Sequence, residues 1–281
     1  MLRASSRLSR LNVALAGAGT AAAIASLRTR SLTQCSGSAA STSPIQLYQY
    51  KICPFCNKVK AYLDYTGVDY VSVEVNPLSK SELAFTKEHK KVPVAVINGE
   101  VVAESSVIID KITDLLTKGK GIVAKKPDKS FYPTDTTQWA EWADKKLAVM
   151  LYPNITRSLE ESWECFQYAD SVESWNLPMR YATRVAGTVA MSIANGKIKK
   201  KYGIVDERAE LKTELLVWTD ALKTNDFLHG KKITMPDLMV YGVLRAIEGL
   251  QTFDVIMTEN ARLKVWYDRV KQQIPPSSSA K

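Results

Sequence analysis

The stretch YQYKICPFCNKVKAYLDY, residues 48–65, constrains the fold of this chain more than any other feature. Residues 45–50 alternate between apolar and polar, which predicts a strand. Pro54 follows, and proline is well tolerated at the first position of a helix because that position needs no N–H donor. Cys53 and Cys56 therefore stand where a strand is expected to pass into a helix.

The CxxC pair can be a redox disulfide, half of a metal site, or a pocket for a thiol cofactor. A zinc site usually needs a second cysteine pair, and the other two cysteines of the chain, Cys35 and Cys165, are scattered. No metal site is therefore predicted. Cys53 is expected at the helix N-terminus, where free N–H groups stabilise a thiolate, so it is the predicted attacking thiol. Cys56, one turn further on, is the predicted resolving or packing thiol.

Residues 44–118 have the element order of a thioredoxin-like (glutaredoxin-like) α/β domain. A strand–helix–strand unit comes first, and its two strands should be parallel through a right-handed crossover. A hairpin around Asn98-Gly99 and a helix opening at Ser105 complete the pattern. The expected elements after the first helix are a strand at 71–75, a short helix or turn at 77–87, strands at 92–97 and 101–103, and a helix at 105–116.

A polar linker at 119–133 separates this domain from an all-α domain expected at 134–274, with a flexible tail at 275–281. The periodicity beyond the linker is helical throughout. The expected helices lie near 139–147, 155–168, 177–201, 206–222, 235–250 and 262–270.

Within the helical region, Thr234 and Asp237 form a capping-box pattern, flanked by Ile233 and Leu238 as a hydrophobic staple. Asp237 is therefore predicted to be a helix cap rather than a catalytic base. The remaining acids of the region, including Glu141, Asp144 and Glu160-Glu161, are interpreted as solvated helix faces. The six tryptophans (139, 142, 163, 175, 218 and 266) are interpreted as core or interface anchors.

Residues 1–43 are rich in arginine, serine and alanine and contain no acid. This composition predicts a mitochondrial transit peptide. The alternatives are a retained membrane anchor built on residues 11–27, which would place the protein on an endomembrane such as the Golgi, and an unstructured tail. A cytosolic protein after cleavage of the leader is a further alternative.

The formal net charge of +9 does not indicate nucleic-acid binding. Five arginines of the leader account for more than half of this charge, and the lysines of the rest are interpreted as a solvated face.

Together these features resemble a known family. The motifs are LYQYKICPFCNKVKAYLDY, VEVNPLSKSEL, KKVPVAVINGE, ESSVIID, WAEWADKKLAVMLYPNITRSLEE and MPDLMVYGVLRAIEGL, in that order. A CPFC glutaredoxin-like domain before an all-helical domain is similar to the glutathione transferase architecture, and the motif set is similar to the prostaglandin E synthase 2 family over positions 46–270.

The resemblance implies a thiol- and glutathione-dependent isomerase that converts prostaglandin H2, a lipid endoperoxide, to prostaglandin E2. It implies Tyr50 and Cys53 as catalytic residues. It also implies homodimerisation through the helical domain, membrane association, and a haem-bound form in which the glutathione sulfur holds the iron and prostaglandin H2 is degraded. The implied glutathione contacts are Cys53, Phe55, Val92, Pro93, Glu104 and Ser105.

Physical arguments support several of these contacts. A cis-proline at position 93 would face the CxxC, as it does in thioredoxin-like folds, and Val92 would offer its backbone to glutathione. A helix N-terminus at Ser105 suits the γ-glutamyl carboxylate, although this serine can equally be a plain N-cap. Glu104 departs from the aspartate usual at this position.

Two other functions stay open from the sequence. The intact CPFC is also typical of a glutaredoxin-like thiol–disulfide oxidoreductase or a glutathione transferase. A haem or iron–sulfur carrier is the third hypothesis, since a cluster can be bridged by cysteine thiolates across a dimer. Neither His89 nor His229 lies in a haem motif.

Overall fold

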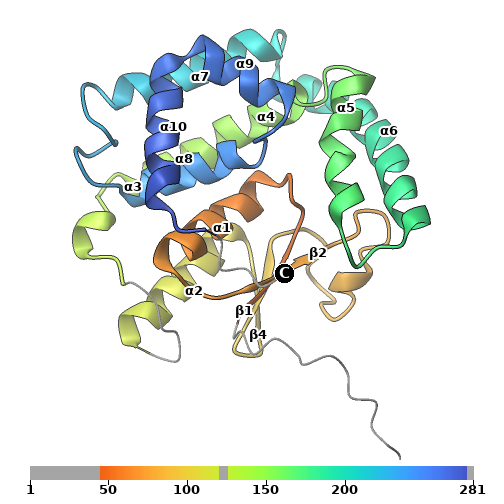
Figure 1. The fold of residues 1–281 in the computed structure, drawn as a ribbon, viewed down its shortest axis with the longest axis horizontal. Helices are drawn as coiled ribbons and strands as arrows, with labels where there is room; N and C mark the ends of the chain where they lie inside the picture. Colours follow the sequence, from red (N-terminus) through yellow and green to blue (C-terminus); the bar gives the residue numbers. More distant parts are fainter. Residues whose placement is uncertain (1–44, 120–125, 277–281) are drawn as a thin grey trace, which may run out of the picture. The chain divides into compact units, whose positions relative to one another are not determined.

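The computed structural model of the chain describes residues 45–119 and 126–276, and a four-stranded sheet forms its first part. The strand order is β2-β1-β3-β4 (Figure 1). The parallel β1–β2 pair and the antiparallel β1–β3 and β3–β4 pairs match the predicted thioredoxin-like topology. The strands are β1 (Ile45–Gln49), β2 (Val71–Glu74), β3 (Val94–Ile97) and β4 (Glu100–Ala103).

Two helices pack together against the sheet, α1 (Pro54–Thr66) and α2 (Ser105–Lys118). The inward-facing residues of β1, Ile45 and Leu47, are fully buried in the core that these helices complete. α1 ends at Gly67, whose φ of 70° is the left-handed conformation that stops a helix at little cost. The predicted strand, helix start and helix stop around the CxxC are thus confirmed.

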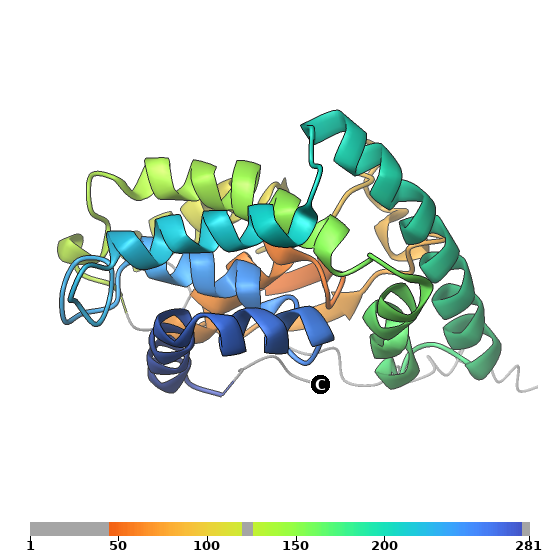
Figure 2. The same cartoon turned by 90° about the horizontal axis from the view of Figure 1, so that it is seen from above.

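The remainder of the described chain is helical, as predicted. α3 (Thr136–Trp142) continues through a π-helical segment, Ala143–Leu147, into α4 (Ala148–Asn154), and α4 runs beside α7 (Figure 2). The other helices are α5 (Leu159–Cys165), α6 (Leu177–Tyr202), α7 (Glu207–Ala221), α8 (Met235–Arg245), α9 (Gln251–Glu259) and α10 (Ala261–Gln273). Short 3₁₀ turns lie at Ser81–Leu83, Lys129–Phe131 and Phe166–Ser171.

Two of the helix predictions were wrong in detail. α8 ends at Arg245 rather than at residue 250, and a further helix, α9, follows it. Leu250 caps this new helix in an extended conformation, so the apolar run that looked like one helix contains a break. The region 155–168 holds α5 and the start of a 3₁₀ turn rather than one continuous helix.

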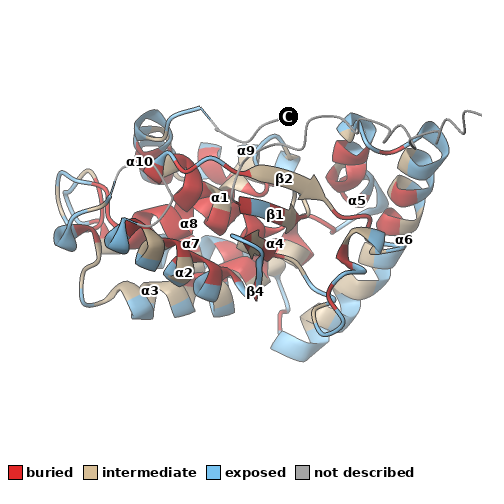
Figure 3. Ribbon diagram, turned by 90° about the horizontal axis from the view of Figure 1, so that it is seen from below, coloured by how far each residue is buried: buried red, intermediate tan, exposed pale blue. Residues whose placement is uncertain are grey.

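α8 joins the helical region to α1. Every residue of α8 from Met235 to Leu244 is buried, and Figure 3 shows this helix red where the outer helix α6 is largely exposed. At Gly242 the two helices touch closely, because a Cβ there would lie 2.6 Å from the Cα of Lys58. The glycine therefore permits a backbone contact that no other residue would allow.

Asp144 corrects an expectation from the sequence. It was interpreted as part of a solvated face, but its carboxylate pairs with Lys58, whose side chain is only 1% exposed. A buried ammonium needs a counter-charge, and a distant residue supplies it. A second ion pair between the two halves joins Arg245 of α8 to Asp64 of α1 at 2.8 Å.

The capping box at the start of α8 is confirmed. Asp237 accepts hydrogen bonds from the backbone N–H of Thr234 (3.0 Å) and the indole of Trp266 (2.9 Å), so its carboxylate is fully committed to structure. Four of the six tryptophans, at 139, 142, 218 and 266, contact one another in the core. Trp163 differs, since it is 37% exposed with the Arg184 guanidinium over its ring.

The prediction for the leader falls on residues outside the described part of the chain. Across 45–119 and 126–276, none of the helices combines the length and the apolar character needed to span a bilayer.

Candidate active site

Cys53 is the N-cap of α1, the position predicted for the attacking thiol. Its Sγ accepts a hydrogen bond from the backbone N–H of Cys56 at 3.4 Å, in the manner of a capping side chain. Cys53 is 6% exposed and Cys56 is fully buried. The two thiols therefore differ in access as expected, and both are free.

The environment moves the pKa values of the two thiols in opposite directions. Burial opposes ionisation of Cys53, but hydrogen bonds from the Cys56 side chain and from the N–H groups of Cys56 and Phe55 outweigh it, so the pKa of Cys53 lies below its ordinary value. Burial and the hydrogen bond to Cys53 raise the pKa of Cys56 well above its ordinary value. The Cys53 thiol is thus the more readily ionised of the pair, and Cys56 is its hydrogen-bond donor.

Tyr50 lies just beyond the end of β1 and three residues before the thiol. Its backbone carbonyl accepts the N–H of Cys53 at 3.0 Å, which fixes the turn that carries both residues. Burial, together with the nearby Cys53, raises the pKa of Tyr50 to about 12. The hydroxyl therefore stays protonated at neutral pH and can donate a hydrogen bond.

A pocket of about 410 Å³ gathers most of the predicted site. Two predicted residues are absent from its lining. Cys56 is fully buried, and Ser105 is a buried residue in the first turn of α2. Among the predicted residues, the lining contains Tyr50, Cys53, Phe55, Val92, Pro93 and Glu104.

The peptide bond between Val92 and Pro93 is cis, as the fold argument predicted. It lies in the wall of the same pocket as Cys53. The helix beside it has Glu104, not Ser105, as its N-cap, with φ of 70°. Ser105 is therefore not the cap that the sequence allowed.

Four further lining residues were missed, namely Lys80, Lys90, Lys91 and Tyr152. The two adjacent lysines directly precede the Val92-Pro93 turn, so their place beside the thiol could have been inferred from that turn. Tyr152 comes from α4 in the helical half, and no local sequence signal indicates its approach. The ammonium of Lys80 donates a hydrogen bond to the Lys90 carbonyl at 3.0 Å, which holds Lys80 beside the other two lysines.

The lysines make the pocket cationic, and Glu104 is the one acid among the described residues of its lining. Glutathione carries two carboxylates and one ammonium, so lysines of this pocket can pair with its carboxylates and Glu104 with its ammonium. The pocket also brings the cis-proline turn and a thiol together, which suits a tripeptide thiol.

A metal centre has no support in the part of the chain that the structure describes, where no group of three or more metal-ligating side chains occurs. His229 lies outside the pocket and contacts Thr234 and Asp135, each at 3.2 Å.

Comparison with known proteins identifies the family. Residues 47–116 match the family described as glutathione S-transferase, N-terminal domain. Prostaglandin E synthase 2 of Danio rerio is 32% identical over 267 residues, which cover 81% of this chain and 70% of that protein. The chain belongs to the prostaglandin E synthase 2 family.

A second relative agrees with this membership, and a solved structure shows the fold. Prostaglandin E synthase 2 of Mus musculus is 29% identical over 276 residues, covering 84% of this chain and 71% of the relative. Among solved structures, glutathione S-transferase III in its apo form superposes with a TM-score of 0.51 at 16% identity, covering 83% of this chain and 99% of that one. The fold is therefore glutathione-transferase-like, as predicted.

Proposed function

We propose that this protein is a thiol- and glutathione-dependent isomerase that converts prostaglandin H2 to prostaglandin E2. Membership of the prostaglandin E synthase 2 family supports the reaction. One observation supports placing this reaction at the thiol pocket. Tyr50 and Cys53 line the same pocket, the pKa of the Cys53 thiol is lowered, and the Tyr50 phenol is protonated.

The proposed chemistry is a redox-neutral rearrangement of the endoperoxide. The Cys53 thiolate attacks one peroxide oxygen, so an S–O bond forms as the O–O bond breaks. The released oxygen takes the Tyr50 proton and becomes a hydroxyl. The Tyr50 phenolate then takes the proton from the carbon that bears the sulfur-bound oxygen, which restores the phenol, creates a carbonyl and returns the S–O electron pair to sulfur. The product is an isomer, and the thiolate is regenerated.

Glutathione, when bound, supplies a second thiol to this pocket. Val92 would hold its backbone beside the cis-proline, Glu104 would face its ammonium, and the three lysines would face its carboxylates. Tyr152 closes the pocket from the helical half, which limits the access of water to the reacting oxygen.

The test is conversion of prostaglandin H2 by the purified protein with glutathione, with the product resolved by chromatography. Wild-type protein is expected to raise prostaglandin E2 above the buffer rate, and Cys53→Ser is expected to abolish the increase. Wild-type conversion by Cys53→Ser would refute the role of the thiol, and no conversion by the wild type would refute the activity.

A thiol–disulfide oxidoreductase is the second candidate, and one observation favours it. Cys53 and Cys56 are adjacent free thiols with opposite pKa shifts, which is the asymmetry that disulfide exchange needs. Reduction of a glutathionylated peptide should then occur. If the wild type shows no turnover of that substrate, this candidate is removed.

A haem-loaded form is a further proposal from the family resemblance. The thiol of bound glutathione would hold the iron, the pocket lysines would face the haem propionates, and the haem would supply redox chemistry that degrades the endoperoxide. Absorption spectra after addition of glutathione and haem test this form, and spectra after addition of glutathione, iron and sulfide test the alternative of an iron–sulfur carrier. A protein without a Soret band in the first experiment would exclude the haem form, and one without a charge-transfer band in the second would exclude the carrier.

We also propose a homodimer formed through the helical half. An apolar stripe along α6 supports it, because these side chains recur every four residues and are exposed. The stripe consists of Leu177, Tyr181, Val185, Val189 and Ile193. Light scattering should give twice the monomer mass, and Tyr181→Glu with Val189→Glu should give the monomer; a monomeric wild type would contradict the proposal.

For the leader we propose import into the mitochondrion followed by cleavage. Its acid-free, arginine-rich composition supports this, and membrane attachment through the same segment is the alternative. N-terminal sequencing of the protein from isolated mitochondria decides between them, because a retained Met1 would contradict cleavage.

A further inference from the structure

A second and larger cavity lies on the other side of the strand–helix junction from the thiol pocket. It has a volume of about 1050 Å³ and is bordered by α1, α8, α10 and the 3₁₀ turn after α5. Lys51 and Ile52 of the junction face this cavity, whereas Tyr50 and Cys53 face the thiol pocket. The proposed isomerase function does not use this space.

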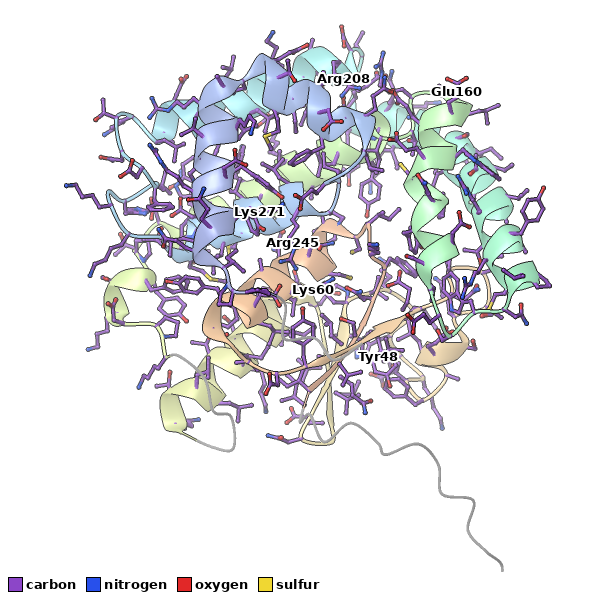
Figure 4. The ribbon with its side chains drawn as sticks, in the orientation of Figure 1. Tyr48, Lys60, Glu160, Arg208, Arg245 and Lys271 are labelled. Carbon is purple, nitrogen blue, oxygen red and sulfur yellow. The ribbon has the colours of Figure 1, made fainter. Side chains whose placement is uncertain are left out.

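Basic side chains from three helices converge on the cavity. Figure 4 shows Lys60 of α1, Arg245 of α8 and Lys271 of α10 next to one another, and all three belong to the lining. Helices far apart in the sequence supply them, so their convergence is a property of the fold.

Most charges of the lining already have partners. Arg245 pairs with Asp64 at 2.8 Å, and Lys271 pairs with Glu248. Asp64 also accepts the hydroxyl of Tyr70 at 2.9 Å, so this carboxylate is doubly engaged.

The two remaining acids of the lining are also engaged. Asp170 is bound by Arg184, and Glu164 accepts the backbone N–H of Gln251 at 3.1 Å. None of the four described acids of the lining forms an ion pair with Lys60.

Among the described cations of the lining, Lys51 and Lys60 have no such partner for their ammonium groups, and Lys51 is exposed to solvent whereas Lys60 is not. Lys60 is partly buried and makes no hydrogen bond or ion pair with any residue in the described ranges. Burial, followed by repulsion from Arg245, lowers the pKa of Lys60. The carboxylates of Asp64 and Glu74 attract this ammonium, but neither forms an ion pair with it. An anion in the cavity would supply a counter-ion in direct contact.

The rest of the wall is largely apolar. The strand–helix junction contributes Ile52, α8 contributes Tyr241, and the loop before α9 contributes Leu250. The end of α10 adds Ile274 and Pro275. A small hydrated ion would leave this apolar surface uncovered, whereas an apolar chain would bury it at a gain of about 25 cal/mol per Å².

We propose that this cavity binds an amphiphilic anion, with a carboxylate or phosphate head on Lys60 and an apolar chain along Ile52, Leu250 and Ile274. The site is distinct from the thiol pocket, and it does not depend on the identity of the reaction performed there. Carboxylate and phosphate heads share the chemistry that Lys60 recognises, so the test compares them.

The test is titration calorimetry of the full chain with laurate, dodecyl phosphate, dodecanol and inorganic phosphate, each below its aggregation limit. Binding of laurate or dodecyl phosphate is expected, and the stronger of the two identifies the head group. Dodecanol and inorganic phosphate should bind at least about tenfold more weakly, since each lacks half of the interaction. This comparison needs no variant. Equal binding of laurate and dodecanol, or of dodecyl phosphate and inorganic phosphate, would overturn the proposal.

Variants locate the site. Lys60→Met should weaken binding of the preferred acid at least about tenfold, and Lys60→Gln provides a second neutral variant if the first does not fold. Lys197→Met removes an exposed lysine of α6 outside the cavity and should bind as the wild type does. Cys53→Ser should also bind normally, which separates this site from the thiol pocket. Unchanged binding by folded Lys60→Met would refute the assignment.

Discussion

Two buried cysteines in neighbouring cavities have opposite ionisation behaviour. Cys53 is 6% exposed and caps the start of α1, and its thiol accepts N–H hydrogen bonds that lower its pKa. Cys165 is 2% exposed and is the last residue of α5. Its thiol donates to the carbonyl of Ile155 at 2.8 Å, and burial together with the charges of Glu164 and Glu161 raises its pKa to about 12.

The comparison shows that burial alone does not decide the reactivity of a thiol. Both sulfurs are withdrawn from water, but one meets the N–H end of a helix and the other lies at the carbonyl end of a helix among acids. The sequence position relative to the helix therefore determines which cysteine can carry chemistry.

The largest expected difference is in activity. Cys53→Ser should lower kcat/KM for prostaglandin H2 by about 1,000-fold or more, because it removes the activated nucleophile. Cys165→Ala should leave kcat/KM unchanged and cost about 1 kcal/mol of unfolding free energy, since it removes one buried sulfur. Steady-state assays and urea unfolding measure both variants. Equal activity losses would show that the two thiols are not distinguished as described.

The next largest effect concerns the phenol beside the thiol. Tyr50→Phe removes the proton donor to the departing oxygen and should lower kcat by about 100-fold. Tyr48→Phe on β1 is the matched control, because the Tyr48 hydroxyl donates to Gln46 (3.2 Å) and does not line the pocket. The pKa of Tyr50, about 12, implies a protonated phenol and a rate that does not fall between pH 6 and 9. Similar rates for the two variants would remove Tyr50 from the mechanism.

A stability measurement tests the close contact between Gly242 of α8 and Lys58 of α1. Gly242→Ala should destabilise the fold by about 1–3 kcal/mol, because the added Cβ would lie 2.6 Å from the Cα of Lys58. Gly196→Ala is the control, since its Cβ meets nothing within 4 Å on α6, and it should stabilise the helix by about 0.5–1 kcal/mol. Urea unfolding measures both changes, and a neutral Gly242→Ala would contradict the close packing of α8 on α1.

The smallest expected effect is a change in the Cys53 pKa itself. Cys56→Ala removes a side-chain hydrogen bond to the Cys53 sulfur and should raise the Cys53 pKa, whereas Cys56→Ser keeps a donor and should raise it less. Thiolate absorbance in a pH titration measures the shift. An unchanged pKa in Cys56→Ala would assign the stabilisation of the thiolate to the backbone alone.

Local patterns predicted much of this architecture. The strand, Pro54, the helix and Gly67 were readable because each depends on neighbouring residues, and so was the capping box at Thr234 and Asp237. The break before α9 was missed because Leu250 is apolar and continues the helical pattern, although its backbone is extended.

Long-range contacts could not be predicted from the sequence. Asp144 and Lys58 are 86 residues apart, and no local rule reveals that one neutralises the other. Tyr152 approaches the thiol from α4 in the same way. The fold brings these residues together, so only the packing of the helical half on α1 identifies them.

The most direct test is the rate of iodoacetamide alkylation at Cys53 and at Cys165, followed against pH by mass spectrometry of the peptides. Thiolate is the reactive form, and a lowered pKa means that its fraction reaches its maximum at a lower pH. The account predicts that labelling of Cys53 levels off at a lower pH than that of free cysteine, while Cys165 stays unlabelled until strongly alkaline pH. A Cys53 midpoint at or above that of free cysteine, or labelling of Cys165 before Cys53, would contradict it.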